Sequence, residues 1–129
     1  MNRLELNSSV WGSNYWAVLY CIGLSYSDNP TPDQQNKMLS YLINLRLPCD
    51  VCQLDYEQNS LTQYPVTLDT VNSRSNLLQW ICNIKNIERV KNNLTPLVPN
   101  DLYSFWSFYD KKKVKDGEYF CCDNTTNTV

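Results

Sequence analysis

The sequence predicts an all-α protein, a small four-helix bundle followed by a short fifth helix. Two observations support this prediction: apolar residues recur every three or four positions in separate segments, and no segment shows the two-residue alternation of a strand. A chain of 129 residues is long enough for one domain with a real core. We expect residues 1–109 to form that domain and residues 110–129 to be a polar, mobile C-terminal tail.

The first two helices follow from apolar periodicity and from the loop between them. Residues 11–24 carry their apolar side chains on one helical face. Residues 27–32 have the composition of a loop, with Thr31 as the expected N-cap and a proline at the first helical position. The pattern resumes over residues 33–45, and Pro48 ends the second helix.

The remaining helices are separated by polar segments. We expect a third helix over residues 49–59, followed by a polar, threonine-rich loop over residues 59–75. The longest apolar stripe spans residues 77–94 and predicts a fourth helix that ends before Pro96. A short fifth helix is expected over residues 100–109.

Composition restricts the possible functions. Eleven basic and thirteen acidic residues give a net charge of −2, which argues against nucleic-acid binding because phosphate contacts need clustered Lys and Arg. The absence of histidine removes the commonest general base, Cys-His nucleophile pairs and most transition-metal sites. No apolar run approaches about 18 residues, so no membrane span is expected. An enzyme with this composition must use thiols, carboxylates or a bound cofactor.

The motif Cys-x-x-Cys at Cys49 and Cys52 is the strongest candidate for such chemistry. Two cysteines three positions apart on the first turn of a helix can close a small disulfide. The unpaired amides and the helix dipole at that end favour a thiolate on the first sulfur. We therefore predict that Cys49 and Cys52 are a redox-active pair.

Two other interpretations of the motif have less support. A zinc site needs a second ligand pair at suitable spacing, and only Cys82 and the Cys121-Cys122 pair remain, with no histidine to complete the site. A thioredoxin-like site needs a strand before the motif, whereas the preceding residues have a helical pattern. We expect no metal site. Cys21 is expected to be a small buried apolar side chain.

The N-terminal residues lack the apolar segment of a signal peptide, and an acidic residue stands too early for a transit peptide. We therefore expect the protein in the cytosol, where thiols stay reduced unless they carry out redox chemistry.

Four segments together resemble one known protein family. They are Trp11-Gly12-x-x-x-Trp16-Ala17-Val18-Leu19-Tyr20, Tyr26-Ser27-Asp28-Asn29-Pro30-Thr31-Pro32-Asp33-Gln34-Gln35, Leu47-Pro48-Cys49-x-x-Cys52 and Gln79-Trp80-Ile81-Cys82-Asn83-Ile84-Lys85-Asn86. Their order and spacing, over roughly residues 11–95, resemble the Erv/ALR family of FAD-linked sulfhydryl oxidases.

The resemblance implies FAD as cofactor and disulfide formation in client proteins as the activity. Client thiols would attack Cys49, and Cys52 would lie against the flavin and pass electrons to it, with oxygen as acceptor and hydrogen peroxide as product. The implied partners are reduced client proteins or a thioredoxin-like dithiol carrier, and a second copy of the chain in a homodimer. The residues implied in cofactor binding are Trp11, Gly12, Trp16, Tyr20, Trp80, Asn83, Asn86 and Lys91.

The sequence departs from the family pattern where the family has histidines. Tyr20 replaces one, and Asn83 and Lys85 replace two more. Two alternatives therefore stay open: a non-catalytic binding or assembly protein with a degenerate flavin site, and a zinc-stabilised helical adaptor. For Cys82 the alternatives are a free thiol or a bridge to the Cys121-Cys122 pair, which could instead be a shuttle for electrons.

The compact size also resembles the oxidases encoded by large cytoplasmic DNA viruses. This resemblance implies a viral protein that acts in the cytoplasm of an infected host cell or is packaged in the virion.

Overall fold

The computed structural model describes residues 4–109, and within this part of the chain the fold is all-α, as predicted. Its helices are α1 (Ser8–Ser25), α2 (Pro32–Ile43), α3 (Asp50–Asp55), the π-helical turn η1 (Tyr56–Ser60), α4 (Leu61–Gln63), α5 (Arg74–Lys91) and α6 (Pro99–Tyr109). The predicted tail, with Cys121 and Cys122, lies outside the described residues, so the domain boundary after residue 109 stays a prediction.

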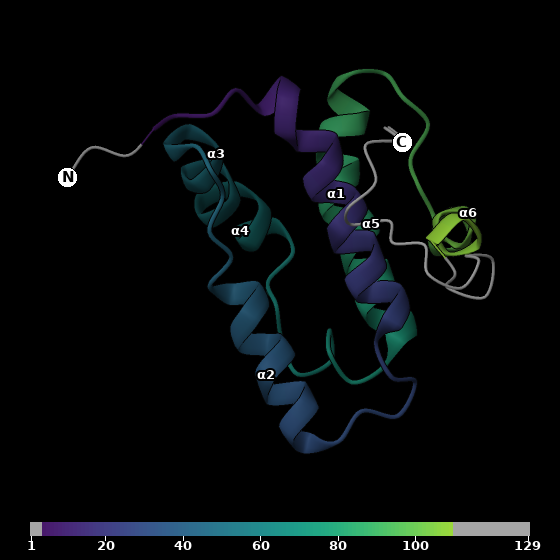
Figure 1. The fold of residues 1–129 in the computed structure, drawn as a ribbon. Coiled ribbons are helices and arrows are strands. Elements are labelled where there is room, and N and C mark those ends of the chain that lie inside the picture. The colour runs from purple at the N-terminus through teal and green to yellow at the C-terminus, as the bar shows by residue number, and fades with distance from the viewer. Residues whose placement is uncertain (1–3, 110–129) are drawn as a thin grey trace, which may run out of the picture.

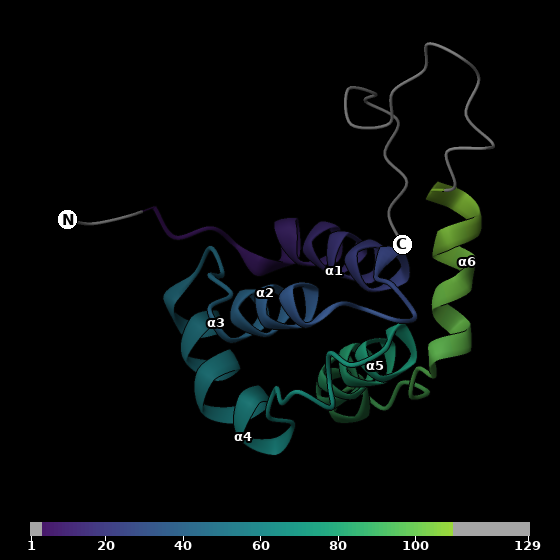
Figure 2. The ribbon, with the colours of Figure 1, turned by 90° about the horizontal axis from the view of Figure 1, so that it is seen from below.

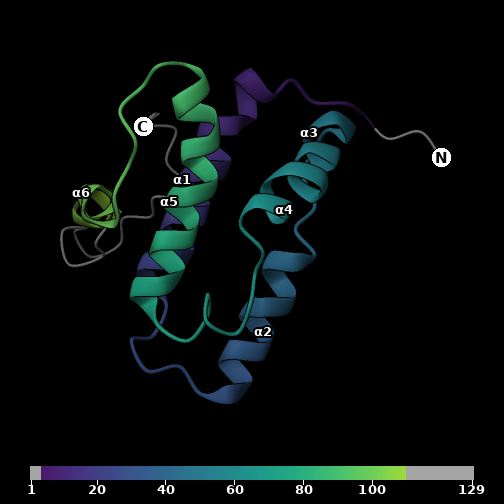
Figure 3. The same cartoon turned by 180° about the vertical axis from the view of Figure 1, so that it is seen from behind.

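The helices form a bundle in which α1 and α5 lie side by side and run in opposite directions (Figure 1). On the other side, α2 runs back along the bundle, and the segment from α3 to α4 covers its end (Figure 3). Helix α6 crosses α1 and α5 and packs against both (Figure 2). The predicted bundle with a fifth helix after it is therefore confirmed.

Side-chain caps explain where the helices begin. Asn7 accepts a hydrogen bond from the Ser9 amide at 3.0 Å, so α1 starts three residues earlier than the apolar pattern indicated. Thr31 and Gln34 form a capping box at the predicted start of α2. Ser73 accepts from the Asn76 amide and starts α5 before its first apolar residue.

The third helical segment is longer than predicted. The expected helix over residues 49–59 continues through η1 and α4 to Gln63, so the prediction of a loop from residue 59 is wrong at its start. A single π-helical turn inserts one residue into the helical ladder. It begins at the buried Tyr56, whose hydroxyl donates to the Leu42 carbonyl. The turn therefore joins the segment after the cysteine pair to α2.

Helices α1 and α5 approach most closely at Gly23. A Cβ atom added there would lie 2.6 Å from Ile81 Cδ1 and 2.9 Å from Leu78 Cδ2. Leu78 and Ile81 are fully buried, at 1% and 0% exposure, and have no free space to move into. Glycine is therefore required here by the packing of the two helices, not by backbone conformation.

We predict that Gly23→Ala destabilises the protein. Alanine favours a helix over glycine by about 0.5–1 kcal/mol, but overpacking costs about 1–3 kcal/mol, so the free energy of unfolding should fall by about 1–2 kcal/mol. Urea denaturation measures the change. Gly12→Ala on the same helix is the control, because nothing lies within 4 Å of its added Cβ and it should not destabilise. Equal stability of the Gly23 variant and the wild type would contradict this account of the helix contact.

Candidate active site

Cys49 and Cys52 form a disulfide at the start of α3, with a Cα–Cα distance of 5.3 Å. Cys49 is the N-cap residue, and its Sγ accepts a hydrogen bond from the Cys52 amide at 3.1 Å. Both cysteines are partly exposed. The predicted pair on the first turn of a helix is therefore present, and its first sulfur accepts a hydrogen bond from a helix-start amide, a contact that favours a thiolate.

A buried glutamine fixes the chain before the disulfide. Gln53 accepts from the Leu47 amide at 2.7 Å and donates to the Leu45 carbonyl at 2.9 Å. Its amide also donates to Glu57 at 2.9 Å, and the Gln53 residue is only 6% exposed. Because an unmet buried amide costs about 1–3 kcal/mol, these bonds hold the redox loop, residues 45–49, in one position.

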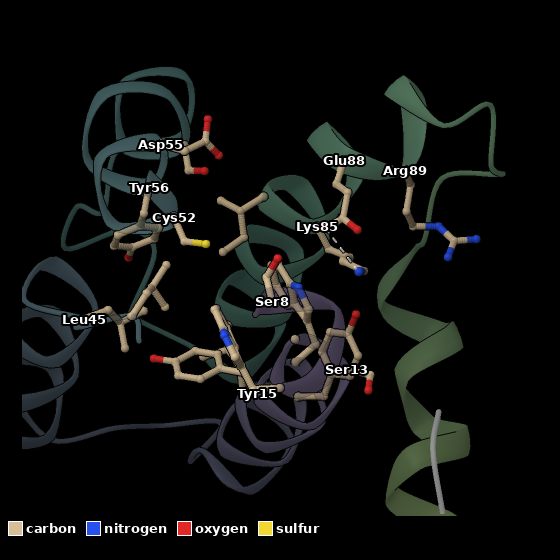
Figure 4. Close-up of a pocket in the computed structure, with 18 of the residues that line it drawn as sticks. Ser8, Ser13, Tyr15, Leu45, Cys52, Asp55, Tyr56, Lys85, Glu88 and Arg89 are labelled. Carbon is tan, nitrogen blue, oxygen red and sulfur yellow. Dashed lines mark ion pairs between the residues drawn. The ribbon is translucent and has the colours of Figure 1, made fainter. Parts of the chain in front are cut away.

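The disulfide opens onto a cavity of about 880 Å³ between α1, α3, α5 and α6. This volume is in the range of cofactor and ligand sites. Cys52 lines the cavity, whereas Cys49 does not. Figure 4 shows the Cys52 sulfur directed into the cavity from α3, with Tyr15 of α1 and Lys85 of α5 on other sides. The two sulfurs of one disulfide therefore have different surroundings.

Aromatic side chains form one wall of the cavity. The rings of Trp16 and Tyr20 lie 5.9 Å apart, and Tyr20 meets Phe105 of α6 edge-on at 4.8 Å. At the other end of the wall, Trp11 meets Tyr15 edge-on at 5.8 Å. Burial raises the pKa of the Tyr20 hydroxyl, so it stays neutral at physiological pH. Such a wall suits a flat aromatic ligand.

Charged side chains of α5 form the adjoining wall. Lys85 Nζ lies 4.9 Å from the centre of the Trp16 ring, a cation–π contact, and 3.5 Å from Glu88. Arg89, one turn further on, also lines the cavity, while its Nε donates to the Thr95 carbonyl at 2.7 Å. With Glu88 also in the cavity lining, this wall carries two cations and one carboxylate, a net positive charge that suits an anionic group of a ligand.

The structure places the predicted site residues in two sets. Cys52, Trp11, Gly12, Trp16 and Tyr20 all line the cavity. Trp80, Asn83, Asn86 and Lys91 lie on α5 and are not among the cavity-lining residues.

Each residue of the second set has another place in the structure. Trp80 belongs to the core, and its indole N–H donates to the Tyr64 carbonyl at 2.8 Å. Asn86 donates to the Leu97 carbonyl at 2.9 Å and accepts from the same residue's amide at 2.7 Å. Asn83 accepts from Gln79, and Lys91 is exposed at the end of α5. A role for these four in cofactor binding stays a prediction.

Several cavity residues were not predicted. Tyr15 and Arg89 line the cavity, each one helical turn from a residue the sequence had singled out: Trp11 and Lys85. Helical spacing could have found both. Leu45 and Tyr56 also line it, but they come from a loop and from the π-helical turn, where spacing gives no such signal.

Neither of the other described cysteines is placed for redox exchange. Burial raises the pKa of the Cys82 thiol to about 11, with a smaller contribution from Asp101. Burial also raises the pKa of Cys21, although this side chain is only partly buried and not fully so as expected. The proposed partners of Cys82 lie outside the described residues.

Among residues 4–109, no group of three or more Cys, Asp or Glu side chains could hold a metal ion. No described helix is both long and apolar enough to cross a membrane.

Two named relatives and a solved structure are similar to this chain. A probable FAD-linked sulfhydryl oxidase of Acanthamoeba polyphaga mimivirus is 32% identical over 60% of this chain and 54% of its own length. The mitochondrial FAD-linked sulfhydryl oxidase of Schizosaccharomyces pombe is 35% identical over 58% of this chain and 41% of its own. The crystal structure of the FAD-binding domain of Erv1 from Saccharomyces cerevisiae shares the fold, with a TM-score of 0.67 at 24% identity over 81% of this chain and 97% of that one.

The chain thus spans about half the length of these curated relatives. The sequence model that describes the Erv1/Alr family matches residues 13–107 of this chain. These residues include the cysteine pair and most of the cavity wall. The resemblance found in the four sequence segments is therefore confirmed, and the chain belongs to the Erv1/Alr family.

Proposed function

We propose that the protein is an FAD-dependent sulfhydryl oxidase that forms disulfide bonds in client proteins. The observation that carries this proposal is the disulfide with one sulfur facing a large aromatic cavity and the other outside it. Such an arrangement lets one disulfide exchange with a client on one side and pass electrons to a cofactor on the other. The names of the relatives, FAD-linked sulfhydryl oxidases, support the same activity.

The residues of the cavity fit FAD. Trp16, Tyr20 and Trp11 offer aromatic faces to its rings, and Gly12 leaves open space on the same helix. Lys85 and Arg89 supply positive charge suited to its diphosphate. These contacts need none of the family's histidines, so the substitutions at Tyr20, Asn83 and Lys85 are compatible with a working site.

Thiol exchange begins at Cys49. A client thiolate attacks Cys49 Sγ, the bond between Cys49 and Cys52 breaks, and its electron pair leaves on Cys52 Sγ inside the cavity. A second client thiolate then attacks the client sulfur of the mixed disulfide, and the client leaves with a new disulfide. Cys49 and Cys52 have by then gained two electrons. The thiolate of Cys52 lies where a cofactor bound in the cavity could receive them.

When bound in the cavity beside Cys52, FAD would supply the two-electron chemistry that links the reduced pair to oxygen, with hydrogen peroxide as product. The chain's own contribution is to hold Cys52 in the cavity wall through α3 and the redox loop, and to keep Cys49 accessible to clients.

We propose reduced client proteins or a thioredoxin-like dithiol carrier as partners, and a homodimer through α1 and α2, where Val18 is 59% and Tyr41 is 45% exposed. The mimivirus relative supports a viral protein that works in the cytoplasm of an infected cell or in the virion.

One spectrum of the purified protein tests the proposal. Bound flavin gives an absorbance band near about 450 nm. Colourless protein that contains zinc would favour the adaptor, and colourless, metal-free protein would favour a binding or assembly role.

We predict that Cys49→Ser and Cys52→Ser both abolish turnover, for different reasons. Without Cys49 no client can enter, whereas without Cys52 the Cys49 thiolate can still attack the disulfide of an oxidised client, and the mixed disulfide persists because Cys52 is not there to resolve it. Oxygen uptake with dithiothreitol should therefore be lost in both variants. After incubation with an oxidised client, non-reducing gels should show trapped client complexes for Cys52→Ser alone. Near-normal oxygen uptake by either variant would overturn the assignment of the redox pair.

We also predict that Trp16→Ala loses flavin. Removal of the ring takes away an aromatic face and the group over which Lys85 lies, so FAD affinity should fall by about tenfold or more. The flavin absorbance per mole of purified protein measures this. Tyr103→Ala, an exposed aromatic of α6 that does not line the cavity, is the control and should retain its flavin. Equal flavin content in both variants would place the cofactor elsewhere.

A further inference from the structure

The segment before α1 lies against the redox loop. The Leu6 amide donates to the Pro48 carbonyl at 3.2 Å, and Glu5 Oε2 accepts from the Asp50 amide at 3.0 Å. In Figure 1 this segment passes beside the start of α3 on its way to α1. Its contacts therefore flank Cys49 on both sides, and we call residues 4–7 the clasp.

The other end of the clasp is attached to the cavity wall. The Trp11 indole N–H donates to the Leu6 carbonyl at 2.9 Å, and Trp11 lines the cavity. Asn7, the last residue of the clasp, caps α1. The clasp thus joins the first helix to the loop that carries the disulfide, across about 45 residues of sequence.

These contacts bring a carboxylate to the start of α3. Cys49 Sγ accepts from the Cys52 amide at 3.1 Å, and Glu5 accepts from the amide of the residue that follows Cys49. A thiolate on Cys49 and the Glu5 carboxylate would therefore be two negative charges at the same helix start, and like charges repel each other.

The other charged groups around the pair come from several elements. Helix α3 carries Asp50 and Asp55, and Glu57 on η1 lies 4.0 Å from Arg46 of the redox loop. Across the cavity, α5 carries Lys85, Glu88 and Arg89. Glu5 is the charged residue of the clasp. Its carboxylate accepts from the Asp50 amide, the residue next to Cys49 in the chain.

We propose that Glu5 is a positioning residue of thiol exchange: its carboxylate holds the clasp on the redox loop and disfavours negative charge on Cys49. The inference rests on the proposed function, because Cys49 acquires that charge when the oxidised client leaves. In that step the second client thiolate attacks the client's own sulfur, the bond to Cys49 breaks, and the electron pair goes to Cys49 Sγ. Glu5 therefore limits how readily Cys49 acts as a leaving group.

Labelling of Cys49 tests the charge directly and needs neither flavin nor oxygen. In a Cys52→Ser background, which prevents disulfide formation, iodoacetamide labelling of Cys49 is followed by mass spectrometry of its peptide across a range of pH. Glu5→Gln keeps an acceptor oxygen but removes the charge, so labelling at a pH where most of Cys49 is protonated should be about three- to tenfold faster. The difference should shrink in about 1 M salt, because salt screens exposed charges.

The control for labelling is Asp33→Asn, which removes a carboxylate that pairs with Lys37 on α2. It should label at the background rate. A labelling rate for Glu5→Gln equal to that background, at low salt, would overturn the proposal. Failure of the proposed function would instead appear as absent oxygen uptake by the wild-type protein, which the labelling experiment does not depend on.

Hydrogen exchange tests the clasp itself. In Glu5→Ala the Asp50 amide loses its acceptor, so its exchange measured by NMR should be about tenfold faster or more than in wild type, whereas Glu5→Gln should retain part of the protection. Unchanged protection of this amide in Glu5→Ala would show that the carboxylate does not hold the loop, and would also overturn the proposal.

Discussion

The packing of α1 against α5 is the contact on which the site depends. Gly23 lets the two helices approach until Leu78 and Ile81 fill the space between them. The same helices carry the aromatic wall, with Trp16 and Tyr20, and the cationic wall, with Lys85 and Arg89. A core packed this closely permits one register, so the contact at Gly23 also sets which aromatic faces which cation. Helix α6 then adds Phe105 against Tyr20 and completes the wall.

The disulfide is held by a different kind of interaction. Leu45, at one end of the redox loop, is buried in the core, and hydrogen bonds fix the rest of the loop from two sides. Gln53 binds the loop from the buried side, and the clasp binds it from the exposed side. Thiol exchange needs three sulfurs nearly in line, so a loop that moved freely would lose rate even with both cysteines intact. We infer that the two sets of hydrogen bonds have the same purpose, which is to keep Cys49 outward and Cys52 inward.

The sequence predicted those features that local periodicity and short motifs determine. Helices α1 and α5 and the cysteine pair were found this way, whereas Trp16 and Tyr20 were assigned through the family resemblance. The continuation of the third helix to Gln63 was missed because its residues after Tyr56 are polar except Leu61, and one apolar residue makes no apolar stripe. The pairing of Asn86 with Leu97, and of Glu5 with the Asp50 amide, was missed because tertiary structure, not local pattern, brings those groups together.

Environment, not residue type, separates the cysteines of this chain into different roles. Cys49 lies at a helix start, where amides stabilise a thiolate and Glu5 opposes it. Cys52 faces a cavity lined by aromatic and cationic side chains, and Cys82 is buried with a pKa of about 11, so it stays a thiol. A chain without histidine has no imidazole to activate a sulfur, and the thiolate must be favoured by backbone amides and nearby charges instead. In such a site no general base acts on the sulfur beside the nearby charges. A single carboxylate next to Cys49 should therefore change the rate of thiol exchange more than it would in a site that has an imidazole base.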